Sequence, residues 1–498
     1  MKKKYIPLAI GLSLATTALA QPSITIYSSA QPGTLSQQIF KSGGEGYNVP
    51  GYALIRQERE FTLNRGRNTL RLSDVAGQID PTTVSFESLT DPAGTRVIEQ
   101  SFEFDLVSTA KLLNKYLDQD IAVVQSLGQS PETVSGTLVG TQGGLVLKGS
   151  DGAVRVVNGY SQIKLPALPG GLISKPTLVW DISADKAGSH KARYAYQTGG
   201  ITWWADYNLI YNDGHDANSC KLDVGSWVTI VNQSGTGYDN ARLKLIAGDV
   251  QRAQPKPAAV GYAQSEMKLA KLKEEGFAEK SFFEYHLYTL GRPATLANNA
   301  IKQIELFPTA HDVACEKSLV YYGQAGQYLS YYGSPMTDRN FGNQSNKKVD
   351  VYLRFKNARN NNLGIPFPAG KVRVSKMDSA DGSMEFIGED VIDHTPRDET
   401  VQIKLGSAFD VVGERRQVDY RIDTTAKWLE EEIEVKVRNQ KDDAVNVIVK
   451  ENLYRWSTWN IIRKSQEFQK QDARTIHFPV RIAKGGEAVI RYTVRYTW

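Results

Sequence analysis

The stretch ITWWADYNLIY at residues 201–211 sets the fold class of this chain. Polar side chains such as Thr202, Asp206 and Asn208 stand between large apolar ones in this stretch. The apolar set is Ile201, Trp203, Ala205, Tyr207, Leu209 and Tyr211. Because successive side chains of a β-strand point to opposite faces, this alternation predicts a strand with one face on a core.

The same alternation recurs at 349–355, 433–437, 476–482 and 490–498, whereas helical periodicity is scarce. A chain of 498 residues has room for roughly three or four domains. The sequence therefore predicts a mainly β, multi-domain protein. We expect immunoglobulin-like β-sandwiches with a small inserted β-barrel and one or two short helices.

Turn signals and shifts of composition divide the chain into five segments. Five short strand patterns with tight turns at Gly143-Gly144 and Asp151-Gly152 favour the small barrel. The predicted segments are a signal peptide at 1–20, an N-terminal β domain at 21–102, a helix plus small β-barrel at 103–170, a central β domain at 171–345 with a helical excursion at 262–280, and a C-terminal β-sandwich of one or two modules at 346–498.

The first twenty residues have the pattern of a secretory signal peptide. Three lysines follow Met1, an apolar run follows them, and Ala18-Leu19-Ala20 supplies small side chains at the cleavage positions. This pattern predicts cleavage between Ala20 and Gln21, because the apolar run is short for a membrane anchor. We therefore expect a periplasmic or secreted protein with no transmembrane segment after cleavage.

Cys220 and Cys315 are the only two cysteines. In an oxidising compartment an even number of cysteines favours pairing. We therefore expect a disulfide between Cys220 and Cys315, and two buried free thiols are the alternative.

The charge balance bears on the partner. Loss of Lys2, Lys3 and Lys4 on cleavage leaves 56 basic residues against 54 acidic ones, a formal charge of +2. A nearly neutral chain is a poor match for a polyanion, so we expect no nucleic-acid partner.

The sequence has no catalytic or metal-binding signature. No two of its six histidines stand three or four residues apart. Asp213-Gly214-His215-Asp216 could hold calcium, but it lacks the ligand spacing of a calcium loop and favours a hairpin turn. Ser234 does not lie in a nucleophile-elbow pattern. We expect no catalytic residue, no metal site and no bound cofactor.

Aromatic side chains are the one candidate binding feature. Trp456 and Trp459, with Tyr454 and Arg455 beside them, could form a surface on which sugar rings stack. Packing in a sandwich core is the alternative. In the last strand we expect Tyr492, Val494, Tyr496 and Trp498 to join a core, with Arg491 and Arg495 in solvent.

Three alternating strands stop at an asparagine before a polar turn, at Asn232, Asn357 and Asn439. Asparagine ends strands readily because it tolerates left-handed backbone and caps turns. The recurrence fits repeated immunoglobulin-like modules, although the pattern is too common to prove duplication.

Five blocks of the chain resemble a known family. They are YQTGGITWWADYN at 196–208, GSWVTIVNQSG at 225–235, ARLKLIAGDV at 241–250, PFPAGKVRV at 366–374 and FIGED at 386–390. These blocks are similar to the bacterial domain of unknown function numbered 4139, and the resemblance covers roughly 177–498. The resemblance implies an exported, β-rich protein of uncharacterised function and supplies no catalytic residues.

The features together favour an exported, non-catalytic binding or scaffolding protein of the bacterial cell envelope. Its partner would be an envelope protein or a glycan. The alternatives are a secreted hydrolase with an unrecognised site and an outer-membrane-associated component of envelope assembly.

Overall fold

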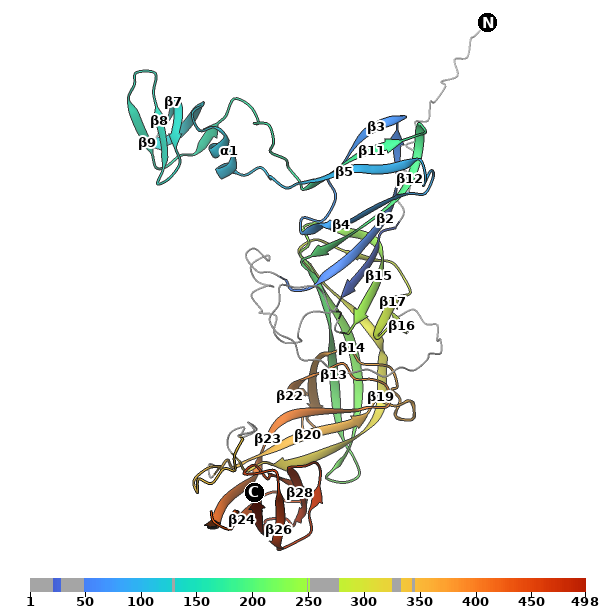
Figure 1. Ribbon diagram of the computed structural model, residues 1–498, viewed down its shortest axis with the longest axis vertical. Coiled ribbons are helices and arrows are strands. Elements are labelled where there is room, and N and C mark those ends of the chain that lie inside the picture. Colours follow the sequence, from blue (N-terminus) through green and yellow to red (C-terminus); the bar gives the residue numbers. More distant parts are fainter. Residues whose placement is uncertain are drawn as a thin grey trace.

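A computed structural model describes residues 21–27, 49–127, 130–248, 250, 277–324, 333–342 and 345–498. Within these residues the chain forms four sheets and one α-helix. Three of the sheets form a column along the long axis of the molecule, with the eight-stranded and three-stranded sheets toward one end and the thirteen-stranded sheet toward the other, and the fourth sheet stands to one side (Figure 1). The predicted mainly β fold class is confirmed.

One end of the column is a sandwich of an eight-stranded and a three-stranded sheet. The eight-stranded sheet runs β16 (Phe277–Phe282), β17 (Tyr285–Leu290), β15 (Tyr238–Ala247), β1 (Ser23–Tyr27), β2 (Tyr52–Leu63), β12 (Gly188–Gly199) and β4 (Ile79–Ser88), with β18 (Ala294–Leu296) paired to β15. The three-stranded sheet runs β3 (Gly66–Leu72), β11 (Thr177–Ala184) and β5 (Thr95–Glu103). Trp180 of β11 meets Phe86 and Tyr194 edge to face, which joins the two layers.

The eight-stranded sheet contains strands that are far apart in the sequence. β1 pairs in parallel with β15, so that Ile24 lies opposite Leu243. The segments predicted as N-terminal and central domains therefore share one sheet.

The lateral sheet holds the helix and five short strands. These are α1 (Thr109–Lys115) and, in sheet order, β10 (Gln162–Lys164), β6 (Asp120–Leu127), β7 (Ser130–Gly140), β8 (Leu145–Lys148) and β9 (Val154–Val157). The predicted barrel is wrong, because no ladder among the described residues joins the edge strands β9 and β10. Its edge strands are short, at three and four residues.

The other end of the column is built on a thirteen-stranded sheet. Its main path is β22 (Met384–Ile392), β21 (Gly370–Met377), β13 (Ile201–Asp213), β14 (Ser219–Asn232), β19 (Ala300–Tyr321), β20 (Lys348–Lys356), β23 (Thr400–Asp423), β24 (Trp428–Asn439), β29 (Glu487–Thr497) and β26 (Trp459–Lys464). β25 (Val445–Asn452) pairs with β19 and β28 (Thr475–Ile482), and β27 (Gln469–Lys470) pairs with β28.

Strands β19 and β23 each pass through two hydrophobic cores. In β19, Val313 belongs to the larger core, and Tyr321 belongs to the core of the C-terminal sandwich. In β23, Ile403 belongs to the first of these cores and Val411 to the second. Continuous strands, rather than linkers, therefore connect the two bodies.

Two of the three strand-ending asparagines make matching hydrogen bonds. Asn232, Asn357 and Asn439 are at most 1% exposed. Asn232 and Asn439 each donate to the carbonyl oxygen four residues ahead, at 2.9 and 2.7 Å. They also donate to the carbonyl oxygens of Ala297 and Ala483, at 3.0 and 3.1 Å, and so tie each turn to a second strand end. This repeated geometry supports related modules in the chain.

The predicted packing of the last strand is confirmed for its core face. Tyr492, Val494 and Tyr496 are buried, and Trp498 packs partly against the same core. Arg491 and Arg495 are on the opposite face and pair with Glu434 and Glu430. The two arginines are therefore exposed but not free in solvent.

Two predicted segments fall largely outside the described residues. Residues 1–20, including Ala20, are among them, whereas Gln21 is described. Of the predicted helical excursion, 262–276 is also outside, and 277–280 begins strand β16, so the helix is wrong there. Alternation of inward and outward side chains in β16 fits a strand better. No helix in the described part of the chain has the length and apolar character to cross a membrane.

Candidate functional site

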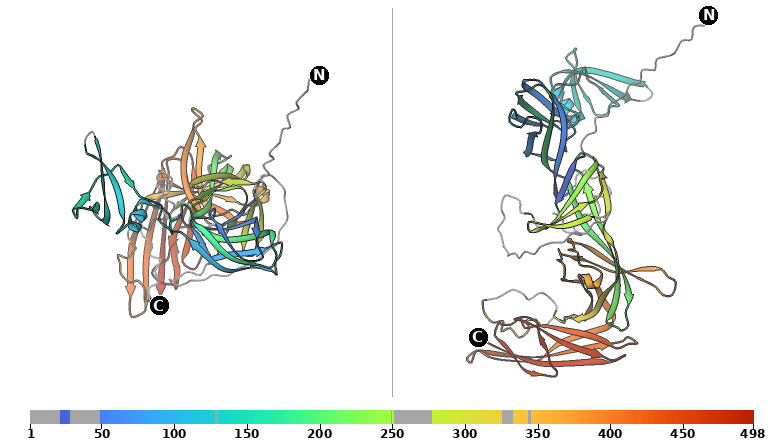
Figure 2. Two further views of the ribbon diagram at one scale, coloured as in Figure 1. Left: turned by 90° about the horizontal axis from the view of Figure 1, so that it is seen from above. Right: turned by 90° about the vertical axis from the view of Figure 1, so that its right-hand side faces the viewer.

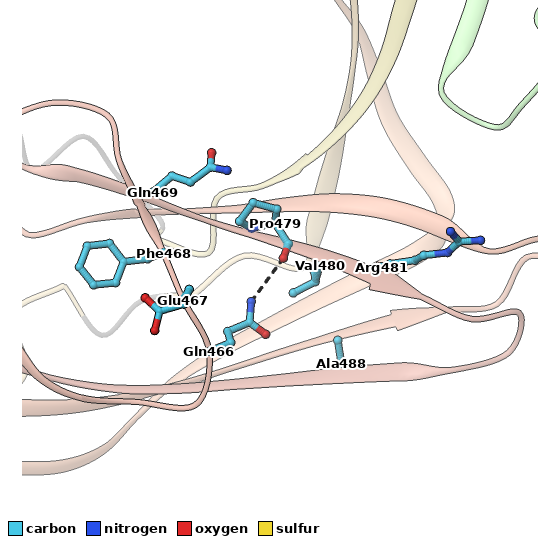
Figure 3. A pocket seen from close by; sticks show the side chains of 8 residues that line it. All are labelled: Gln466, Glu467, Phe468, Gln469, Pro479, Val480, Arg481 and Ala488. Carbon is cyan, nitrogen blue, oxygen red and sulfur yellow. Dashed lines mark hydrogen bonds between the residues drawn. The ribbon is translucent and has the colours of Figure 1, made fainter.

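One hollow lies in the C-terminal sandwich, where the segment before β27 meets β28 and β29 (Figure 3). Its volume is about 470 Å³. It is lined by Gln466, Glu467, Phe468, Gln469, Pro479, Val480, Arg481 and Ala488. Gln466 Nε2 donates to the Pro479 carbonyl oxygen at 3.4 Å, and Glu467 pairs with Lys464 at 2.5 Å. Its acidic group is thus already paired, so this hollow is the weaker candidate.

A second cavity, of about 240 Å³, brings more chemistry together. We call it the lysine cavity. It is lined by Tyr211 and Asp213 of β13, Lys317 of β19, Val351 of β20, Lys376 of β21, Ile387 of β22, and Leu405, Gly406 and Ser407 of β23. Side chains at alternate positions of a strand share a face, which places Tyr211 and Asp213 together on β13.

The predicted disulfide is confirmed, and it lies beside the lysine cavity. Cys220 and Cys315 are bonded, with their Cα atoms 4.9 Å apart. The strand register places Asp213 opposite Cys220, and Cys220 opposite Cys315. Lys317 follows Cys315 by two positions and so faces the same side of β19. The disulfide therefore holds the strands that carry Asp213 and Lys317 in register.

One of the two lysines in the cavity is neutralised. Lys376 Nζ lies 2.6 Å from an Asp213 carboxylate oxygen. This hydrogen bond holds the pKa of Asp213 below its usual value, so the carboxylate is ionised at neutral pH. The Lys376 amine also lies 5.5 Å from the centre of the Tyr211 ring, within cation–π range.

Lys317 has no such partner. No carboxylate of the described residues lies within ion-pair distance of its amine, which is 6.0 Å from the centre of the Tyr211 ring. Burial lowers the pKa of Lys317, and the positive charges of Lys441 and Lys376 lower it further, against the attraction of Asp213. A half-buried ammonium group of this kind is stabilised by an incoming negative charge.

Tyr211 adds a hydrogen-bond donor. Its side chain is 5% exposed, and its hydroxyl makes no hydrogen bond of normal geometry among the residues that the structure describes, although it lies close enough to the Asp213 carboxylate to interact with it. Burial, followed by the negative charge of Asp213, raises the pKa of Tyr211, so the hydroxyl stays protonated. A buried hydroxyl without a hydrogen bond of normal geometry is costly, and a ligand oxygen would relieve that cost.

The predicted aromatic surface is largely part of the sandwich. Trp456 and Trp459 are half-buried and pack against the C-terminal core. The indole N–H of Trp459 donates to the Ala473 carbonyl oxygen at 2.8 Å, and the Lys470 amine lies 4.8 Å from its ring centre. Sugar binding at this place stays a prediction, with less exposed ring surface than the sequence suggested.

Arg455, next to the tryptophans in sequence, is buried and structural. Arg455 and Glu431 are each 1% exposed and form an ion pair at 3.1 Å. The Arg455 guanidinium also donates to the carbonyl oxygens of Met336, Asp338 and Phe341, at 3.0, 2.6 and 3.0 Å. It fixes the described segment 333–342 on the C-terminal sandwich.

The two short polar motifs are parts of turns. The Asp216 carboxylate accepts the backbone N–H groups of Asn218 and Ser219, at 2.8 and 2.7 Å, in the hairpin between β13 and β14. Within the described part of the chain no three metal-ligating side chains come together. The Ser234 hydroxyl is buried and donates to Asn232 Oδ1 at 2.7 Å, which gives it a structural partner.

The sequence did not reveal the lysine cavity. Its residues come from six strands and span positions 211 to 407, and no motif links them. Lys317 is two residues after Cys315, so the predicted disulfide was the nearest available signal.

Comparison of the chain with family models, curated proteins and solved structures found no match. The class of protein is therefore defined by the fold and the cavity alone. They describe an extended, mainly β protein with one disulfide and a cavity lined by two lysines, an aspartate and a tyrosine.

Proposed function

We propose that this chain is an exported, non-catalytic binding or scaffolding protein of the bacterial cell envelope, located in the periplasm or outside the cell. The residues before Gln21 support export, because they have the basic, apolar and small-residue parts of a signal peptide. The disulfide agrees with an oxidising compartment. The resemblance to the domain of unknown function numbered 4139 points the same way.

The observation that carries the proposal is the way the units are joined. β19 and β23 each contribute to two cores, so the bodies follow one another as one extended column (Figure 2). The lateral sheet stands away from this column in Figure 1 and in the left view of Figure 2. A column that holds a separate small sheet to one side suits a protein that positions partners.

The lateral sheet also favours contact with a partner. On its edge strand β9, Val154 and Val156 are 62% and 58% exposed. Exposed apolar side chains on an edge strand mark surfaces that bind other chains. An envelope protein is therefore the partner that this surface supports best, and a glycan is the second.

In-cell photo-crosslinking tests the proposal. A photoreactive residue at Val154 should give a discrete adduct with an envelope component, whereas the same residue at the fully buried Leu147 should give none. N-terminal sequencing of the exported chain should begin at Gln21.

Three results would contradict the proposal. Equal adducts from both positions would show nonspecific capture. Turnover of cell-wall glycan or peptide by the purified protein would favour the hydrolase. Retention of the protein in the outer membrane through a carbonate wash would favour the membrane-associated component.

A further inference from the structure

We propose that the lysine cavity binds a small acidic ligand, namely a single carboxylate joined to a short apolar group. This inference goes beyond the binding or scaffolding role, because it rests on the cavity residues and not on export or on the lateral sheet. The experiment that tests it changes residues of the cavity, whereas the crosslinking experiment changes residues of the lateral sheet.

The net charge of the cavity favours a ligand with one negative charge. Asp213 and Lys376 form an ion pair at 2.6 Å and cancel each other. Lys317 then contributes the one lining charge without a counter-ion among the described residues. A dianion such as phosphate would bring a second negative charge close to Asp213, which is unfavourable. A monocarboxylate matches the remaining charge.

The donors of the cavity suit a carboxylate. Lys317 supplies a charged N–H donor, and the hydroxyl of Tyr211, which makes no hydrogen bond of normal geometry and lies near the Asp213 carboxylate, supplies a neutral one. The Lys317 amine lies 6.0 Å from the centre of the Tyr211 ring, and both side chains line the same cavity. A carboxylate has two acceptor oxygens and can satisfy both donors together.

The remaining walls favour an apolar group beside the carboxylate. Val351, Ile387 and Leu405 line the cavity and are all half-buried. At roughly 30 Å³ for each water-sized group, a volume of about 240 Å³ holds about eight such groups. A carboxylate with a chain of a few carbons fits this volume, either as a free acid or as the end of a longer molecule.

Titration calorimetry of the full mature chain with hexanoate is the test. At pH 7 we expect hexanoate to bind at least tenfold more tightly than the neutral hexanamide. Lys317→Met should weaken hexanoate binding at least tenfold, and Tyr211→Phe should weaken it severalfold. The matched control Lys356→Met changes an exposed lysine of β20 outside the cavity and should leave the affinity unchanged.

A proton signature tests the role of Lys317 separately. A bound carboxylate raises the pKa of this amine, so at alkaline pH, where part of the free amine has lost its proton, hexanoate binding should take up protons and weaken as the pH rises. Uptake is measured by repeating the titration in buffers of different ionisation enthalpy. Lys317→Met should abolish the uptake, and its thermal unfolding curve verifies that the variant is folded.

Two further arms identify the ligand source and its limits. A peptide that ends in a leucine carboxylate, if it binds tenfold more tightly than hexanoate, assigns the site to the end of a larger molecule, and weaker binding assigns it to a free acid. Equal binding of hexanamide, unchanged binding by Lys317→Met, or tighter binding of inorganic phosphate than of hexanoate would each overturn the proposal.

Discussion

Gly413 of β23 packs its backbone against the ring of Tyr321 of β19, and a Cβ at position 413 would overlap that ring. Tyr321 is fully buried, and its hydroxyl donates to the Asn346 carbonyl oxygen at 2.8 Å. The two strands that connect the cores therefore approach each other at a position that only glycine fits.

Substitution of this glycine should destabilise the protein. Gly413→Ala would force the Tyr321 ring to move, at a cost of about 1–3 kcal/mol in the free energy of unfolding. Gly170→Ala, where an added Cβ meets nothing, should change the same quantity by less than about 0.5 kcal/mol. Urea unfolding measures both. The double variant Gly413→Ala with Tyr321→Leu should lose less than the two single changes combined, and strict additivity would contradict the contact.

The buried ion pair of Arg455 and Glu431 gives a second prediction. Arg455→Met leaves the Glu431 carboxylate buried without its partner, which should cost about 3–5 kcal/mol. Segment 333–342 should then exchange its amide hydrogens faster than in the wild type. The control Arg421→Met breaks the exposed pair with Asp419 and should cost at most about 1 kcal/mol. Equal losses from the two variants would show that burial does not matter here.

The disulfide should contribute mainly through the unfolded chain. Cys220 and Cys315 are 95 residues apart, and closing a loop of this length is worth roughly 4 kcal/mol in the chain-entropy treatment. The double variant Cys220→Ala with Cys315→Ala should lose up to that amount in urea unfolding. Reduced wild type should match the variant. Two alkylatable thiols in denatured, unreduced protein would contradict the pairing.

Lys317 gives a prediction about pH. Its pKa is lowered in the folded chain from the ordinary value of 10.5, so the unfolded chain holds this proton more tightly. The stability of the wild type should therefore rise as the pH increases from the folded pKa toward 10.5. Lys317→Met should raise the Tm at neutral pH, and this gain should shrink as the pH rises from the folded pKa toward 10.5 and be absent above it. The exposed control Lys356→Met should show no such trend, and a constant gain at all pH values would contradict the assignment.

The alternation of apolar and polar residues was enough to predict the strands. The burial of residues such as Ile201 and Trp203 follows from this two-residue period alone. The Cys220–Cys315 disulfide was also predictable, since two cysteines allow only one pairing. The parallel pairing of Ile24 with Leu243 was not, because local periodicity carries no information on partners more than two hundred residues away. The open lateral sheet was missed for a similar reason, because strand number does not determine closure.

The candidate site was harder to predict than the fold. The pocket around Lys317 exists because strands from positions 211 to 407 fold over one another. Each residue there has an ordinary identity and an ordinary neighbourhood in the sequence. The aromatic pair Trp456 and Trp459 was visible in the sequence, but its burial depends on the sandwich that covers part of each ring.

The position of the disulfide has a mechanical consequence. At Cys315, strand β19 lies opposite Cys220 of β14 on one side and opposite Phe355 of β20 on the other, where its pairing passes from one neighbour to the next. A ladder is least able to resist shear where it changes partners, and here a covalent bond spans that point. The sulfur bridge therefore keeps β14 joined to β19 at the point where β19 leaves one neighbour for the next.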